Sequence, residues 1–163
     1  MPLNADRFHF SSGAGDLACY VAGQGPPLLL VHSMNAAGSA AEMRPLLDAF
    51  RATRTVFAND LPGFGHSDRS DRAYDARLMT DAIQATAQQV HGRCGTGPID
   101  ALALSTGAEF LARAASEKPA VTEVAAPPAE SLPHVVHAQE CLAEIEKKDP
   151  KTVTEAKRFF LLK

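Results

Sequence analysis

Residues 99–107 read Ile-Asp-Ala-Leu-Ala-Leu-Ser-Thr-Gly, and they decide how the rest of the chain is interpreted. The apolar run at their start is typical of a strand, and a helical spacing of apolar residues follows through about Glu117. Ser105 therefore stands at a strand-to-helix turn, with the small residues Ala103 and Gly107 two positions away on either side. Such a turn exposes a serine hydroxyl at the carboxyl end of a sheet, because only small neighbours let the backbone pack so closely.

This turn has two explanations. A helix that begins just after Ser105 would place free amides and the positive end of its dipole beside the hydroxyl, and Thr106 would supply one such amide. Ser105 would then be a candidate nucleophile. An ordinary N-cap serine explains the same residues equally well, because serine is favoured at the start of helices.

The segments before this turn alternate in character. Short strands are expected at 8–10 and 17–21, a buried strand at 28–31, a helix at 39–50, a strand at 55–58 and a helix at about 75–91. After an antiparallel opening, this alternation predicts an α/β fold with a mostly parallel sheet and helices on both faces.

The chain of 163 residues is expected to form a single domain, 1–163. Residues 1–118 carry its recognisable core. Residues 119–133 are rich in alanine and proline and are interpreted as a linker, and residues 134–163 are interpreted as carboxyl-terminal amphipathic helices.

Composition excludes several classes of function. The formal net charge is −3 and the 16 basic residues are scattered, so no electrostatic footprint for nucleic acid is present. The longest apolar run, 28–31, is far shorter than a membrane span, and the first twenty residues lack the apolar stretch of a signal peptide. Three cysteines without C-x-x-C spacing argue against a disulfide framework or a zinc site. We therefore expect a cytoplasmic protein without membrane or nucleic-acid partners.

A second motif, His32-Ser33-Met34-Asn35, follows the buried strand 28–31. A loop at this place can turn its backbone amides toward the same pocket as the serine turn, and Met34 is the natural second donor to an oxyanion. His32 is expected to order the loop by hydrogen bonding, because a catalytic base would need a different place.

A third motif, Asp60-Leu61-Pro62-Gly63-Phe64-Gly65-His66-Ser67, has two glycines and a proline at offsets that a generic surface loop would not need. Together the three motifs resemble the α/β-hydrolase superfamily over about residues 17–117. In that family the Asp-Pro-Gly turn is architectural, so the resemblance implies that Asp60 and His66 hold this loop together. Ser33 stands where the family usually has a glycine.

The resemblance also implies a catalytic triad in the order serine, acid, histidine. His134 precedes a segment that looks like the family's carboxyl-terminal histidine loop and closing helix, and His137 is the alternative base. Both histidines are explained equally well as exposed residues of a linker. We name no acid, because none of the glutamates after Ser105 stands at a recognisable strand end: Glu109, Glu117, Glu123 and Glu130.

Residues 118–133 are too few for the further strands, the acid and the lid that the family places there. We therefore expect the sheet to lack its last strands and the lid. The strand before Ser105 would then present an unpaired edge, through which the protein could self-associate.

Two functions follow as hypotheses. The first is a serine hydrolase of the carboxylic ester type, acting on a small-molecule acyl substrate with Ser105 and His134 as catalytic residues, Met34 and Thr106 as oxyanion donors, and no metal or organic cofactor. The alternative is a catalytically inactive, shortened hydrolase-like domain that binds a ligand or partner. An aspartate at the elbow would suit epoxide or haloalkane chemistry, whereas this elbow has serine.

Overall fold

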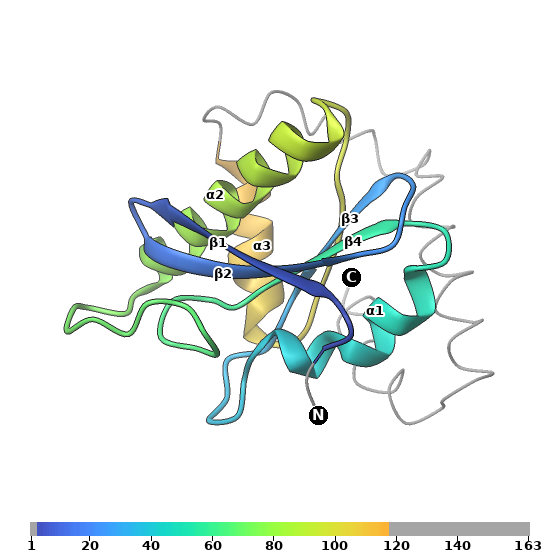
Figure 1. Ribbon diagram of the computed structural model, residues 1–163. Coiled ribbons are helices and arrows are strands. Elements are labelled where there is room, and N and C mark those ends of the chain that lie inside the picture. The colour runs from blue at the N-terminus through green and yellow to red at the C-terminus, as the bar shows by residue number, and fades with distance from the viewer. Residues whose placement is uncertain (1–2, 118–163) are drawn as a thin grey trace.

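The computed structural model describes residues 3–117. They form one mixed sheet with strand order β1-β2-β4-β3-β5 (Figure 1). The strands are β1 Asp6–Ser12, β2 Gly15–Ala22, β3 Pro27–Val31, β4 Thr55–Asn59 and β5 Asp100–Ala103. The linker expected at 119–133 and the helices expected at 134–163 lie outside the described residues.

The antiparallel opening and the parallel core are both confirmed. β1 and β2 form a hairpin, β2 runs antiparallel to β4, and β4, β3 and β5 are parallel to one another. β3 is a continuous apolar run, as expected for a strand that is covered on both faces. The chain leaves β3 for β4 on one side and later returns to β5 on the other side, so β3 is the point at which the direction of winding reverses.

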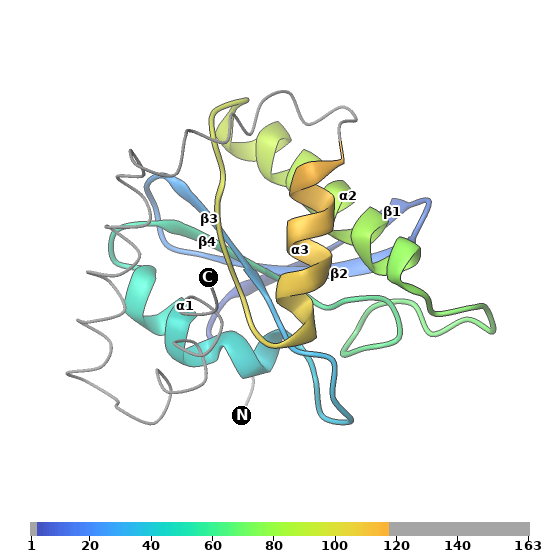
Figure 2. The ribbon, with the colours of Figure 1, turned by 180° about the vertical axis from the view of Figure 1, so that it is seen from behind.

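Helices cover both faces of the sheet (Figures 1 and 2). One face carries the 3₁₀ helix η1 Ala40–Met43 and the helix α1 Arg44–Phe50, and the other carries α2 Ala76–Cys94 and α3 Thr106–Ser116. Right-handed crossovers require this arrangement, because the two connections run in opposite directions across the sheet.

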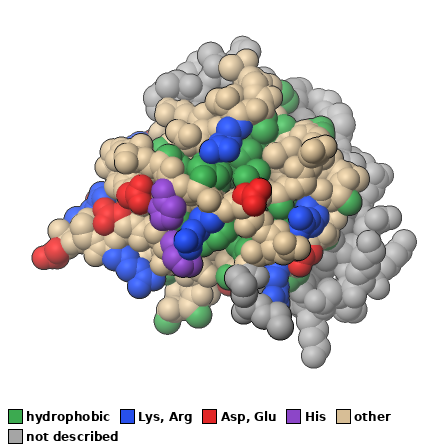
Figure 3. Space-filling model, viewed as in Figure 1, with side chains coloured by type: hydrophobic (Ala, Val, Ile, Leu, Met, Phe, Trp, Pro, Cys, Tyr) green, Lys and Arg blue, Asp and Glu red, His purple; other side chains and the backbone are tan. Residues whose placement is uncertain are grey.

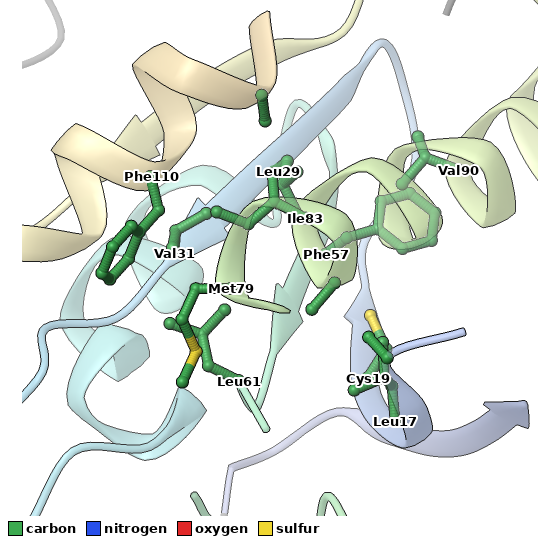
Figure 4. Packing of buried hydrophobic residues seen from close by; sticks show 13 residues of the cluster. Leu17, Cys19, Leu29, Val31, Phe57, Leu61, Met79, Ile83, Val90 and Phe110 are labelled. Atoms are coloured by element: carbon green, nitrogen blue, oxygen red, sulfur yellow. The ribbon is translucent and has the colours of Figure 1, made fainter. Parts of the chain in front are cut away.

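The larger of the two cores lies beneath α2 and α3 (Figure 4). Its centre is built from alternate residues of the strands, so that Val31 and Phe57 face Met79 and Ile83 of α2 and Phe110 of α3. The smaller core lies beneath α1. It is formed by the intervening residues of the same strands, whose side chains point to the opposite face of the sheet. The alternation along each strand therefore sorts apolar side chains to two faces.

Two helix boundaries differ from expectation. The segment predicted as one helix at 39–50 begins as the 3₁₀ helix η1 and becomes α-helical only at Arg44, with Pro45 in its first turn, where the missing N–H costs nothing. The helix predicted at about 75–91 continues through Gly92 and ends at Cys94, followed by Gly95 with φ 89°. A single glycine lowers helix propensity by only about 1 kcal/mol, which tertiary packing overrides.

β5 is less covered than the sequence suggests. All four of its residues are only half-buried, whereas four of the five residues of β3 are buried. The reason is its place in the sheet: among residues 3–117, β5 pairs with β3 alone. The edge expected from the sequence is therefore present in the described part of the chain.

The remaining expectations concern cysteines, charge and membranes. Cys19 is buried, which raises the pKa of its thiol to about 12, and Cys94 is exposed. On the face seen in Figure 3, side chains of both charge signs are interspersed. None of the helices within residues 3–117 combines the length and the apolar character needed to cross a membrane.

Candidate active site

The β3 loop (residues 32–39) and the elbow (residues 103–107) lie at the carboxyl ends of β3 and β5, which are parallel neighbours in the sheet. The Leu104 amide donates to the Val31 carbonyl at 3.0 Å, which continues the β3–β5 pairing to the start of the elbow. Ligand sites of open α/β sheets form in the crevice outside the carboxyl ends of strands where the winding reverses. The β3 loop and the elbow lie at this end of the sheet.

Ser105 has a backbone conformation that a non-glycine residue rarely adopts. Its φ is 51° and its ψ is −135°, and it is the only non-glycine residue with positive φ between residues 3 and 117. A residue held in such a region costs about 1–3 kcal/mol. Ser105 is also exposed. This is the geometry expected of a nucleophile elbow, which turns the serine hydroxyl outward between strand and helix.

The alternative explanation of Ser105 as an ordinary helix cap fails. A capping serine has extended backbone angles and accepts a hydrogen bond from an amide in the first turn. Ser105 has positive φ, and its side chain makes no capping hydrogen bond. Asp75, which begins α2, shows the ordinary arrangement: φ is −109°, ψ is 175°, and its carboxylate accepts from the Leu78 amide at 2.8 Å.

Gly107 lets the elbow pack against the β3 loop. A Cβ added there would lie 2.3 Å from the His32 carbonyl oxygen, far inside van der Waals contact, and 3.3 Å from a methyl of Val31. The obstacle is backbone, so it cannot rotate away. The small residue that the motif requires after the serine is thus explained by a close approach of two backbone segments.

Of the two predicted oxyanion donors, Thr106 lies in the elbow and Met34 in the β3 loop. Thr106 is the first residue of α3, where an amide has no carbonyl of the preceding turn to bind. Met34 is half-buried in the β3 loop. Within residues 3–117, no hydrogen bond engages the amide of either residue. Among the described residues, both amides are therefore donors without an acceptor.

His32 orders the β3 loop, as expected. Its ring is fully buried; Nε2 accepts from the Leu61 amide at 3.0 Å, and Nδ1 lies 2.6 Å from the Ser33 carbonyl, to which it donates. Burial lowers the pKa of His32, so the ring is neutral at physiological pH. With both nitrogens engaged, His32 links the β3 loop to the Asp-Pro-Gly loop and is not a free base.

The Asp-Pro-Gly loop (residues 60–67) is architectural. The buried carboxylate of Asp60 accepts from the Ala40 amide at 2.6 Å, from the His66 amide at 2.9 Å and from the Tyr20 hydroxyl at 3.2 Å. A Cβ at Gly65 would lie 2.1 Å from this carboxylate. Asp60 therefore joins three segments, and both of its carboxylate oxygens accept hydrogen bonds.

Ser33, which stands where the resembled family has glycine, is bound by Glu42 of η1. The Ser33 amide and hydroxyl both donate to the Glu42 carboxylate at 2.8 Å, and the Asn35 side chain also reaches it. Glu42 is a residue of this loop's hydrogen-bond network that the sequence did not indicate. A glutamate nine residues after Ser33 gives no local signal, because only the folding of the loop onto η1 brings the two together.

None of the four described histidines is placed to act as the base for Ser105. His32 has both ring nitrogens engaged, as described above. His9 is on β1, four strands away from β5, a distance of about 19 Å at ordinary strand spacing. His66 follows β4 and is hydrogen bonded to Tyr20 of β2 at 2.8 Å. His91 contacts the Gly97 carbonyl before β5 begins, at the end of that strand opposite Ser105. His134, His137, Glu123 and Glu130 lie outside the described residues.

No protein-family model matches the sequence, and no curated protein matches it. Solved structures do. A haloalkane dehalogenase loop variant from Bradyrhizobium elkanii is similar with a TM-score of 0.58 and 19% identity over 66% of this chain and 34% of that chain. The Cif epoxide hydrolase from Acinetobacter nosocomialis gives 0.59 and 19% over 72% and 36%.

An α/β serine hydrolase homologue from Coxiella burnetii gives a TM-score of 0.59 and 16% identity over 71% of this chain and 58% of that chain. The described part of the chain thus has the α/β-hydrolase fold. The resemblance drawn from the three sequence motifs is confirmed at the level of the fold. The chain spans about a third of the length of the first two of these structures.

Proposed function

We propose that this chain carries the nucleophile and the oxyanion site of a serine hydrolase that cleaves esters or similar acyl bonds of small molecules. The observation that carries the proposal is the backbone of Ser105, at φ 51° and ψ −135° between β5 and α3. Among the described residues, no capping hydrogen bond from the Ser105 side chain offsets this strain. Strain of this kind is concentrated at functional sites.

In the proposed reaction the Ser105 oxygen attacks the acyl carbon, and the Met34 and Thr106 amides stabilise the oxyanion of the tetrahedral intermediate. A histidine takes the serine proton and returns it to the leaving group, after which water hydrolyses the acyl-serine. Of the six histidines in the chain, the four described ones are placed elsewhere, so His134 is proposed as this base and His137 as its alternative.

Serine at the elbow favours acyl substrates over epoxides and haloalkanes. Attack of a serine oxygen on an epoxide or a haloalkane would form an ether, which water does not cleave under mild conditions. Attack on an ester forms a new ester that water can hydrolyse. The elbow of this chain is therefore suited to acyl transfer, although two of the similar solved structures are described as a haloalkane dehalogenase and an epoxide hydrolase.

A second candidate function is a catalytically inactive domain that binds a ligand or a partner. The observation in its favour is the combination of a β5 edge with a single neighbour and the absence, among residues 3–117, of a histidine placed to serve Ser105. In that case the open amides and the edge would serve binding alone.

Labelling with a fluorophosphonate probe distinguishes the two functions. We expect stoichiometric labelling of the wild type and none of Ser105→Ala, because the probe reacts only with an activated serine. Ser116→Ala is the matched control, since Ser116 is an exposed serine at the other end of α3 and should label as the wild type does.

His134→Ala and His137→Ala identify the base. Loss of labelling in His134→Ala alone supports the assignment made here, and loss in His137→Ala alone replaces it. Full labelling in both variants would overturn the proposal of a base within this chain. No labelling of a folded, monodisperse wild type would establish the binding function instead.

A further inference from the structure

The β3 loop of this chain is held by a carboxylate. Both Glu42 oxygens accept from the Ser33 hydroxyl at 2.8 Å, Oε2 also accepts from the Ser33 amide at 2.8 Å, and Oε1 accepts from the Asn35 side chain at 3.3 Å. Hydrogen bonds to an ionised acceptor are roughly twice as strong as neutral ones. Glu42 therefore fixes two residues that flank Met34 on either side.

The same loop is closed at its far end. The Gly38 amide donates to the Asn35 carbonyl at 2.9 Å, and a Cβ at Gly38 would lie 2.6 Å from the Ser33 carbonyl oxygen. The Asn35 side chain also accepts from the Ala37 amide at 2.9 Å. The loop is thus wound tightly, with the amides of Ser33, Ala37 and Gly38 all occupied.

Several amides of the loop have no acceptor among residues 3–117, and the Met34 amide is one of them. Among the described residues, no acceptor engages the Met34 amide, although Ser33 on one side is bound to Glu42 and Asn35 on the other side is bound to Ser33 and Glu42. A loop held on both sides of a free amide presents that amide in one orientation. Preorganisation of this kind is what makes an oxyanion donor effective, because the donor does not have to reorient during the reaction.

We propose that Glu42 is a positioning residue, which acts through Ser33 and Asn35 to hold the Met34 amide in the orientation that serves the reaction of Ser105. The inference rests on the proposed serine hydrolase function. It also explains Ser33: where the resembled family has glycine, the Ser33 hydroxyl adds a hydrogen bond to the same carboxylate. Glu42 touches neither substrate nor Ser105 in this role.

The test compares the rate of fluorophosphonate labelling of the full chain in the wild type and in Glu42→Ala. We expect labelling to slow by roughly 10- to 100-fold, since a donor displaced by about 1 Å can cost that much. Glu42→Gln keeps one acceptor oxygen and should fall between the two. Asp48→Ala is the matched control, because Asp48 is an exposed carboxylate on the adjoining helix α1 with no hydrogen bond among the described residues.

A second readout separates this role from a merely structural one. Hydrogen exchange of the Ser33 amide should become at least about tenfold faster in Glu42→Ala, while exchange in the core strand β3 stays at the wild-type rate. Faster exchange with unchanged labelling would overturn the positioning role. Unchanged exchange would overturn the contact itself.

A double variant adds a further check. Ser33→Ala removes only the hydroxyl and should slow labelling less than Glu42→Ala does. Added to Glu42→Ala, it should have no further effect, because the two residues act through one contact. Additive losses would overturn the coupling. If the wild type itself is not labelled, the proposed function fails, and the exchange measurement still decides whether Glu42 holds the loop.

Discussion

The two longest helices of the described chain begin in opposite ways. α2 begins at Asp75, whose backbone is extended and whose carboxylate accepts from the Leu78 amide at 2.8 Å. α3 begins at Ser105, whose φ is positive and whose side chain makes no capping bond. The start of α2 is arranged for stability, whereas the start of α3 carries backbone strain and leaves the Thr106 amide without an acceptor among residues 3–117.

The first-turn amides of a helix can be used in two ways, for capping or for binding another group. Every helix has free amides in its first turn, and a side chain that caps them removes them from any other role. At α3 the Thr106 amide has no acceptor among residues 3–117, and it lies beyond the carboxyl ends of the strands, where ligand sites of α/β folds form. An uncapped, strained helix start is therefore a better sign of a functional site than the serine itself.

The largest expected effect is that of Gly107→Ala. The added Cβ would lie 2.3 Å from the His32 carbonyl oxygen, so β3 and the elbow must separate. We expect a loss of about 2–4 kcal/mol in the free energy of unfolding, as for other severe steric changes in a packed interior. Urea denaturation measures it.

Gly92→Ala in α2 is the matched control for Gly107→Ala. No atom lies within 4 Å of its added Cβ, and alanine favours the helix, so this variant should gain about 0.5–1 kcal/mol. Equal effects of the two substitutions would show that the close approach at the elbow is not what requires glycine.

A smaller effect is expected from the same substitution at both helix starts. Asp75→Ala removes a capping hydrogen bond and should lower the free energy of unfolding by about 1 kcal/mol, without changing the labelling of Ser105. Ser105→Ala removes no cap and should change the free energy of unfolding by less than about 0.5 kcal/mol. A comparable loss in both variants, measured by urea denaturation, would contradict the distinction between the two helix starts.

An effect of opposite sign, somewhat smaller than that of Asp75→Ala, is expected from Ser105→Gly. Glycine adopts positive φ without strain, so the substitution should raise the free energy of unfolding by about 0.5–1 kcal/mol, after allowing for the greater freedom of glycine in the unfolded chain. Thermal denaturation of Ser105→Gly beside Ser105→Ala isolates the backbone contribution, because both variants lack the hydroxyl. A Ser105→Gly variant less stable than Ser105→Ala would mean that Ser105 is not strained.

Much of the fold could be predicted from the sequence, because its signals are local. The run of apolar residues in β3 and the alternation of strands and helices each depend on neighbours a few residues away. The elbow at Ser105 was found in the same way, from small residues at fixed spacing. The boundary errors at Arg44 and Cys94 arose where proline geometry and packing act against simple propensity.

The order of the elements, the serine between β5 and α3 and the two accompanying loops could all be read from local patterns in the sequence. The interactions between these parts appear only in the folded chain: the strain at Ser105, the contact of Gly107 with the His32 carbonyl, and the binding of Ser33 by Glu42. These interactions join residues that are far apart along the chain or that a loop brings together. His32 and Gly107 are adjacent only because β3 and β5 pair, and no local pattern records a contact that the sheet creates.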